Sequence, residues 1–191
     1  TIVQPIEIDN HTLHVTPSIG ISIFPNDGED PPTLLRNADT AMYHAKDSGR
    51  NNYQFFTAAM NLAVQERMTL ENDLRKGLEN GEFELHYQPQ VHGINSQVSG
   101  VEALIRWRHP TRGLVAPDQF IPVAEETGLI VPIGAWVLRE ACQQARRWQD
   151  EGYADLMMCV NLSARQFQSE ALSEHIEDAL ADSGLLPQSL E

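Results

Sequence analysis

The sequence predicts an α/β protein in two parts: a small N-terminal α/β piece and a larger C-terminal segment in which strands alternate with helices. Three patterns support this prediction. Apolar residues alternate over 19–23, recur at helical spacing over 34–45, and form a continuous run over 156–160. Alternation is typical of a half-buried strand, and a short apolar run is typical of a strand buried on both faces of a parallel sheet. Strands that alternate with helices favour βα units.

In the first part, each element has a local signal. The turn pair Asp9 and Asn10 predicts a hairpin, whose second strand we expect to continue to Phe24. Asp30 precedes a proline and is suited to cap a helix that Gly49 ends. A short strand at 53–56 and a connecting helix over 57–81 follow.

The second part begins with two alternating strands. The remaining apolar patterns predict three helices and one buried strand between them, and Gly184 ends the last helix. In chain order, we expect strands at 83–89 and 101–107, helices at 117–128 and 132–152, a strand at 156–160 and a helix at 169–183.

Composition narrows the class of ligand. Of the 191 residues, 41% are hydrophobic, and Asp and Glu outnumber Lys and Arg by 27 to 13, which gives a formal net charge of −14. Such a chain lacks the positive footprint of a DNA- or RNA-binding domain. It would repel an anionic ligand unless a few Arg or Lys residues, or bound divalent cations, reverse the field locally.

The residues present show neither a membrane span nor a signal peptide, and a membrane anchor of the parent in segments before Thr1 stays open. The longest nearly apolar run, 129–138, is broken by Pro132 and Gly134 and is too short to span a bilayer. The first residues lack the pattern of a signal peptide, and because there is no initiator Met we expect a piece of a longer chain. Cys142 and Cys159 lie in apolar contexts, so we expect two reduced thiols and a cytosolic setting.

Three polar residues stand out as candidate site residues. Glu102 and Arg106 lie on one face of a predicted strand, at most about 13 Å apart, and could contact two ends of one ligand. Asn161 follows the buried strand, at the end where α/β barrels and open α/β sheets place their ligands. The alternatives are a half-buried Glu102–Arg106 ion pair and a capping or turn role for Asn161.

The second part resembles an EAL domain. The run EALIRWRHP at 102–110 has YQPQ before it at 87–90 and FIPVAE after it at 120–125, and VNLS follows at 160–163. The first part resembles the C-terminal end of a GGDEF domain, through SIGIS at 18–22, ADTAMYHAK at 38–46 and GRN at 49–51. The resemblance therefore divides the chain into the end of a GGDEF domain at 1–56, a linker helix at 57–69 and the first half of an EAL domain at 70–191.

The EAL resemblance implies a TIM-like (β/α) barrel phosphodiesterase that opens cyclic di-GMP to linear pGpG with Mg²⁺ or Mn²⁺. It implies that Glu102 and Asn161 are metal ligands with a catalytic role and that Arg106 holds a substrate phosphate. Gln88 and Pro122 are expected to line the substrate groove. Carboxylate and amide oxygens suit a hard cation, and a planar guanidinium suits a phosphate.

The resemblance also sets limits. A (β/α)₈ barrel takes about 250 residues, and the fourth strand would begin at Leu190. The isolated chain is therefore expected to be inactive, because later metal ligands would be missing. Lys46 and Arg50 match nucleotide-phosphate contacts of the GGDEF family but have no catalytic site to serve here, since no two glycines are adjacent.

Two other functions stay open. The first is a non-catalytic EAL module that binds cyclic di-GMP or a partner protein. The second, diguanylate cyclase activity, depends on residues before Thr1. An unclosed barrel also leaves an open sheet edge, so we expect a homodimer or an edge-paired assembly.

Overall fold

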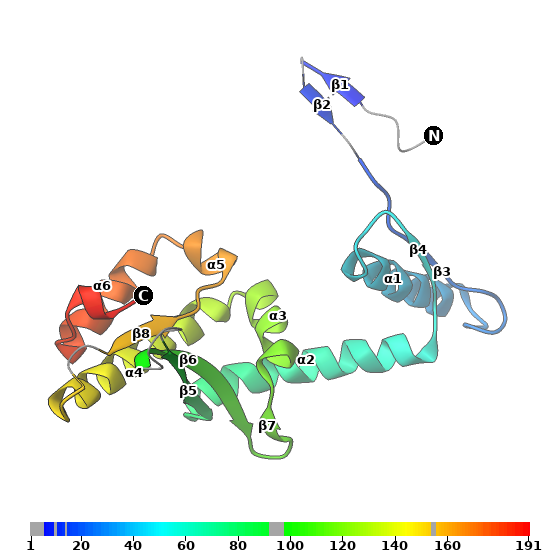
Figure 1. Cartoon of the computed structure of the whole chain (residues 1–191). Helices are drawn as coiled ribbons and strands as arrows, with labels where there is room; N and C mark the ends of the chain where they lie inside the picture. The colour runs from blue at the N-terminus through cyan, green and yellow to red at the C-terminus, as the bar shows by residue number, and fades with distance from the viewer. Residues whose placement is uncertain (1–5, 10, 14, 92–97, 154–155) are drawn as a thin grey trace. The chain divides into compact units, whose positions relative to one another are not determined.

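The computed structural model describes residues 6–9, 11–13, 15–91, 98–153 and 156–191. The chain forms two compact units, Thr1–Thr69 and Leu70–Glu191 (Figure 1). Helix α2, Ala58–Glu79, contains the boundary between them, as expected for a connecting helix. No helix in the described ranges is both long enough and apolar enough to cross a membrane.

The N-terminal unit begins with the expected hairpin. Strands β1, Ile6–Ile8, and β2, His11–Leu13, pair antiparallel around Asp9, which has a φ of 48°. The second strand does not continue to Phe24, however, and this prediction is wrong. Pro17 has no N–H to donate, and pairing resumes only in a separate strand, β3, Ile19–Ile21. Strand β3 pairs in parallel with β4, Tyr53–Phe55.

Helix α1, Pro31–Asp47, covers one face of the β3–β4 pair. Its expected cap is confirmed: the Asp30 carboxylate accepts a 2.9 Å hydrogen bond from the Thr33 backbone N–H, and prolines occupy the first turn. The strand and the helix approach closely at Gly20, where a Cβ atom would lie 1.9 Å from the Ala38 carbonyl oxygen. Only glycine fits this position.

The C-terminal unit is built on four strands: β5, Phe83–Val91, β6, Val98–His109, β7, Gly113–Val115, and β8, Met157–Val160. Strand β6 is central. It pairs antiparallel with β5, and it pairs with β7 near its end and with β8 near its start. Among these four strands, as far as the structure describes them, only the β6–β8 pair is parallel. The expectation of βα units therefore holds from β6 onward but not for β5, because a short connection favours an antiparallel neighbour.

The three expected helices are present as α3, Pro117–Thr127, α4, Ile130–Asp150, and α6, Leu172–Ser183. A four-residue helix, α5, Ala164–Phe167, and a 3₁₀ turn, η1, Pro187–Ser189, complete the unit. Beyond η1, Leu190 forms a parallel bridge with Met158, and the Glu191 N–H donates to the Met158 carbonyl at 2.8 Å. These last two residues thus lie alongside β8 on the edge away from β6.

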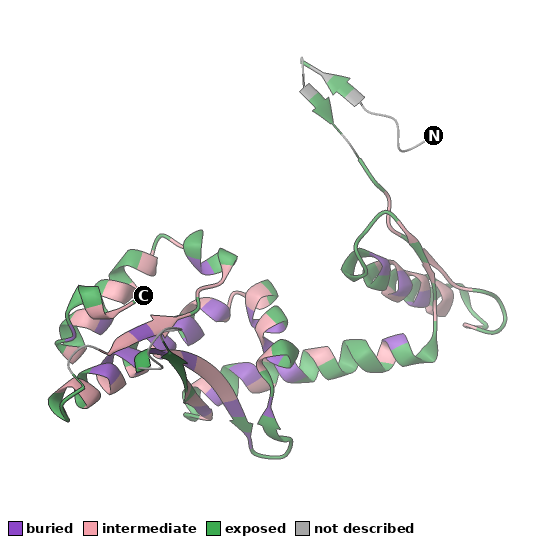
Figure 2. Ribbon diagram, in the orientation of Figure 1, coloured by how far each residue is buried: buried purple, intermediate pink, exposed green. Residues whose placement is uncertain are grey.

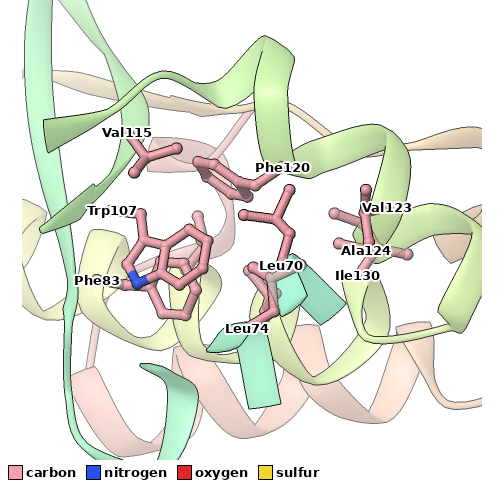
Figure 3. Close-up of a cluster of buried hydrophobic side chains, with 11 residues drawn as sticks. Leu70, Leu74, Phe83, Trp107, Val115, Phe120, Val123, Ala124 and Ile130 are labelled. Atoms are coloured by element: carbon pink, nitrogen blue, oxygen red, sulfur yellow. The ribbon is translucent and has the colours of Figure 1, made fainter. Parts of the chain in front are cut away.

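One face of the sheet is covered. Figure 3 shows Phe83, Trp107, Phe120 and Leu74 pointing toward one another in a core that joins α2 and α3 to the sheet. A second cluster packs α4 and α6 on β6 and β8. Its buried members are Val101, Ala103, Leu138, Ala141, Cys142, Ala145, Met158, Ala179 and Leu185.

The end of β6 is fixed by polar contacts. Buried His109 accepts hydrogen bonds at Nδ1 from the Thr111 and Arg112 backbone N–H groups, both at 3.2 Å. Its other ring nitrogen, Nε2, lies 3.2 Å from the Asp73 carboxylate on α2. Both nitrogens are thus engaged, and the imidazole ties the turn after β6 to the helix.

The other face of the sheet is open. Figure 2 shows the ribbon of the chain coloured by burial class. Along β6, Glu102 and Arg106 are half-buried and Arg108 is exposed, whereas Ala103 and Trp107 on the covered face are buried. The same holds for β8, in which only Met158 is fully buried. The prediction that this strand is buried on both faces is therefore wrong, because the helices pack on one face alone.

Candidate functional site

Glu102 and Asn161 meet at one edge of the open face. In the parallel register, Glu102 lies beside Cys159, and Asn161 follows two residues later, so its side chain projects to the same face. The Asn161 Nδ2 group donates a 2.6 Å hydrogen bond to Glu102 Oε1. The structure thus brings together the two residues that the sequence places on neighbouring strands.

Asn161 is not the cap of the following helix. That position belongs to Ser163, whose hydroxyl accepts from the Gln166 N–H at 3.3 Å, while Gln166 Oε1 accepts from the Ser163 N–H at 3.0 Å. Gln166 is itself buried against Gly134 of α4. Because Ser163 and Gln166 satisfy the end of α5, the Asn161 amide is available to Glu102.

Arg106 lies on the same face as Glu102 but forms no ion pair with it. Its guanidinium donates to the Ile105 carbonyl at 2.8 Å, and this is its one hydrogen bond among the residues that the structure describes. The alternative of a half-buried Glu102–Arg106 ion pair is therefore wrong for this structure. Arg106 keeps most of its donors available to a ligand.

The other expected site residues lie in different places. Gln88 is exposed and directly opposite Glu102 in the β5–β6 register, so both side chains share the open face. Pro122 is exposed inside α3, and its place in a substrate groove stays a prediction. In the N-terminal unit, Lys46 is exposed, with its ammonium 5.9 Å from the Tyr43 ring, and Arg50 is exposed with a φ of 58°. Their phosphate-binding role stays a prediction too.

Sequence reasoning missed a charged group farther along this face. The Arg108 guanidinium donates to both oxygens of the Glu84 carboxylate, at 2.9 and 2.8 Å, and His86 Nε2 lies 3.0 Å from the same carboxylate. The hydrogen bond with His86, and to a smaller extent those from Arg108, lower the pKa of Glu84. The alternation of Glu84, His86 and Gln88 along one strand was the available signal.

Cys159 lies beside Glu102 in the β6–β8 register and two residues before Asn161. Its thiol is 3.4 Å from Gln90 Oε1 and 3.3 Å from Glu191 Oε2. Partial burial and the hydrogen bond to the Glu191 carboxylate raise the pKa of the thiol. Both cysteines are free, as expected from the sequence.

The donor set suits a hard divalent cation in part. Glu102 offers carboxylate oxygens, and Asn161 offers its amide oxygen because the nitrogen already faces Glu102. Within the described ranges, no group of three His, Cys, Asp or Glu side chains could hold a metal ion. Two protein oxygens fit Mg²⁺, which keeps several waters and takes phosphate oxygens as further ligands. They do not form a cage made only of protein donors.

Together, the fold and this edge define an α/β domain whose open sheet face carries two oxygen donors and a guanidinium. The chain belongs to the EAL domain family, whose model matches residues 71–191. Residues 1–52 match a second family, the diguanylate cyclase GGDEF domain. The structure is thus a GGDEF remnant followed by a partial EAL domain.

Known proteins share both parts. The chain is 51% identical over 189 residues to a bifunctional diguanylate cyclase/cyclic di-GMP phosphodiesterase, MucR of Pseudomonas aeruginosa, covering 99% of this chain and 28% of that protein. It is 40% identical over 188 residues to the cyclic di-GMP phosphodiesterase NbdA of the same organism, covering 98% and 24%. The chain thus spans about a quarter of the length of these curated relatives.

Solved structures match as well. A structure described as PaMucR phosphodiesterase in a c-di-GMP complex matches with a TM-score of 0.62 and 52% identity, over 64% of this chain and 49% of that one. The EAL enzyme Bd1971, in its cAMP- and cyclic-di-GMP-bound form, matches with a TM-score of 0.64 and 30% identity, over 85% and 43%. These matches confirm the predicted fold class.

Proposed function

We propose that the chain is part of a cyclic di-GMP phosphodiesterase that opens cyclic di-GMP to linear pGpG. The observation that carries the proposal is the Glu102–Asn161 pair, hydrogen-bonded at 2.6 Å at the carboxyl edge of the parallel strands. Arg106 on the same face supplies the positive group that a phosphate needs. Relatives named as cyclic di-GMP phosphodiesterases support the substrate class.

Glu102 and Asn161 would hold Mg²⁺ or Mn²⁺ through one carboxylate and one amide oxygen. When bound, such an ion supplies an activated water and offsets charge at the phosphoryl oxygens. The hydrogen bond from Asn161 fixes the Glu102 carboxylate in place and leaves the amide oxygen available for a cation. In a chain of net charge −14, such an ion would add to the positive charge of Arg106 in offsetting the charge of a dianionic dinucleotide.

Arg106 would orient the substrate through a phosphate. A planar guanidinium donates two parallel hydrogen bonds to phosphate oxygens. Gln88, opposite Glu102, is placed to donate from its amide to the same ligand. Pro122 would line the groove from α3. Lys46 and Arg50 would be former nucleotide-phosphate contacts of the GGDEF part.

The expected organisation is part of the proposal. Residues 1–56 would be the end of a GGDEF domain, 57–69 a linker helix and 70–191 the first half of the barrel. Within the described residues, β5 pairs only with β6, so one edge of the sheet is open. A homodimer or edge-paired assembly in the cytoplasm would cover that edge, and sedimentation of a compact monomer would contradict it.

The free donors of Arg106 also suit a second candidate, a non-catalytic module that binds cyclic di-GMP or a partner protein. The described residues bring only two metal donors together and no third acidic ligand. Two donors would hold a cation weakly, whereas the Arg106 side chain would still attract a phosphate. Binding without hydrolysis is the behaviour that this candidate predicts.

The test is an assay of the protein that carries this sequence, with cyclic di-GMP and Mg²⁺ or Mn²⁺, in which linear pGpG is quantified by chromatography. Hydrolysis that stops with EDTA and in Glu102→Ala supports the phosphodiesterase. Calorimetric binding without hydrolysis supports the second candidate. A protein that neither binds nor hydrolyses cyclic di-GMP overturns the phosphodiesterase and leaves, of the second candidate, only the module that binds a partner protein. The isolated 191-residue chain is expected not to hydrolyse the substrate.

A further inference from the structure

The geometry points to Arg108 as a positioning residue that keeps Arg106 free for the substrate by occupying the Glu84 carboxylate. This inference rests on the proposed function, in which Arg106 binds a substrate phosphate. It starts from an unusual choice of partner. In the β5–β6 register Glu84 lies directly opposite Arg106, yet its carboxylate is bound by Arg108.

Proximity alone favours the other pair. Side chains directly opposite in an antiparallel pair have Cβ atoms about 5 Å apart, whereas diagonal neighbours are about 7–8 Å apart. Glu84 and Arg106 have opposite charge and share the open face, so the direct pair is the expected one. Instead, Arg108 Nε and Nη2 each donate to a different oxygen of Glu84.

The two-point bond is what gives the diagonal pair its advantage. A guanidinium that donates through two parallel N–H groups matches a carboxylate in geometry as well as charge. His86 adds a third contact to Glu84 Oε1, at 3.0 Å. With both carboxylate oxygens occupied, Glu84 has little capacity left for the arginine directly across from it.

Arg106 is the residue that benefits. Its one described hydrogen bond goes to the neighbouring Ile105 carbonyl, and the rest of its donor fork is unused. An arginine already paired with a carboxylate would have to lose that partner before binding a phosphate. By holding Glu84, Arg108 removes this competition without itself touching the ligand.

Loss of Arg108 should therefore weaken substrate binding through Glu84. In Arg108→Ala, Glu84 loses its two-point partner and pairs with Arg106, and a partly exposed ion pair of this kind lowers the affinity for cyclic di-GMP about fivefold. Removing Glu84 as well should restore affinity, because the competing carboxylate is gone. The side chain of Arg108 is 66% exposed, so neither change disturbs the core.

The experiment measures cyclic di-GMP affinity by calorimetry in EDTA, where no turnover occurs, together with KM and kcat in Mg²⁺. The variants are Arg108→Ala, Glu84→Ala, the double variant and Arg106→Ala, in the protein that carries this sequence. Arg139→Ala, which removes one exposed charge on α4, is the matched control and should leave affinity unchanged. The expected pattern is a raised Kd and KM with unchanged kcat in Arg108→Ala, and a return to the original Kd in the double variant.

Two results would overturn the inference while leaving the proposed function intact. One is a double variant that binds as weakly as Arg108→Ala, which would mean that Arg108 contacts the ligand itself. The other is Arg108→Ala with unchanged affinity while Arg106→Ala loses it. If Arg106→Ala keeps full affinity, the proposed role of Arg106 fails, and the inference fails with it.

Discussion

Asn161 and Glu102, 59 residues apart in sequence, are joined by a 2.6 Å hydrogen bond between amide and carboxylate. Neither strand alone determines this contact. It arises because β6 and β8 run parallel in a register that sets Glu102 beside Cys159 and Asn161 two residues beyond. The shared edge is what turns two ordinary polar side chains into one candidate cation site.

Replacing Glu102 is predicted to abolish hydrolysis. Glu102→Ala removes the charged metal ligand. Loss of a residue that only hydrogen-bonds to a metal ligand lowers activity up to about 100-fold, so loss of the ligand itself should lower kcat/KM by more than that. Asn161→Ala should also lower kcat/KM, because the amide oxygen is lost and Glu102 is no longer held. Glu174→Gln, an exposed carboxylate on α6, is the control. Full activity in Glu102→Ala would refute the assigned role.

Arg106→Lys is predicted to weaken substrate binding while preserving the charge. An ammonium offers no planar pair of donors, so Kd and KM should rise about tenfold, equivalent to about 1.4 kcal/mol. The sheet should be unaffected, since Arg106 bonds only to a neighbouring carbonyl within the described residues. Calorimetry and steady-state kinetics measure the effect. A lysine variant with unchanged KM would show that charge alone is sufficient.

Gly134→Ala is predicted to destabilise the unit that carries the site. An added Cβ would lie 2.0 Å from Gln166 Nε2, and moving this buried side chain away would break the hydrogen bond that Gln166 Oε1 accepts from the Ser163 N–H. The free energy of unfolding should fall by about 1–3 kcal/mol, as in other overpacked cores, despite the better helix propensity of alanine. Urea denaturation measures this change.

A second variant tests the cause of that loss. Gln166→Ala removes the side chain that meets the new methyl group, so the double variant should lose less stability than the two single changes added together. Strict additivity would show that the contact between Gly134 and Gln166 is not responsible. Gln166 also accepts a hydrogen bond from the Ser163 N–H at the start of α5, two residues after Asn161. Gln166→Ala should therefore lower kcat/KM as well as the free energy of unfolding.

The two thiols are predicted to resist alkylation at pH 8. Burial raises the pKa of Cys142 from 9.0 to about 11, so roughly one thiol in a thousand is ionised at that pH. Because burial disfavours the thiolate only in the folded state, the free energy of unfolding falls as the pH rises from 9 toward 11. Mass spectrometry after iodoacetamide should find Cys142 unmodified, Cys159 slowly modified and both labelled in urea. Rapid labelling of native Cys142 would contradict its burial.

Much of the fold follows from local patterns. The turn pair at Asp9, the Asp30 cap and the alternation along β6 each specify an element without help from distant residues. Strand β7 has only three residues, too few for alternation to show. Helix α5 was missed although Ser163 and Gln166 have the spacing of a capping box.

The sequence predicted which residues form the candidate site better than it predicted the contacts between them. Glu102, Asn161 and Arg106 follow from strand alternation and from the position of strand ends. The pairing of Glu84 with Arg108 instead of Arg106 could not be predicted from the sequence. It depends on which guanidinium presents two donors to the carboxylate at the right angle. The antiparallel entry of β5 likewise depends on tertiary pairing.

Because helices cover only one face of the sheet, the residues that stabilise the fold and the candidate site residues lie on opposite faces. Trp107 and Ala103 face the helices and contribute the attraction that keeps the unit folded, while Glu102 and Arg106 alternate with them and face water. Substitutions on the open face can therefore change ligand preference with little change in the free energy of unfolding. A lineage could retune this surface repeatedly while its scaffold stayed the same.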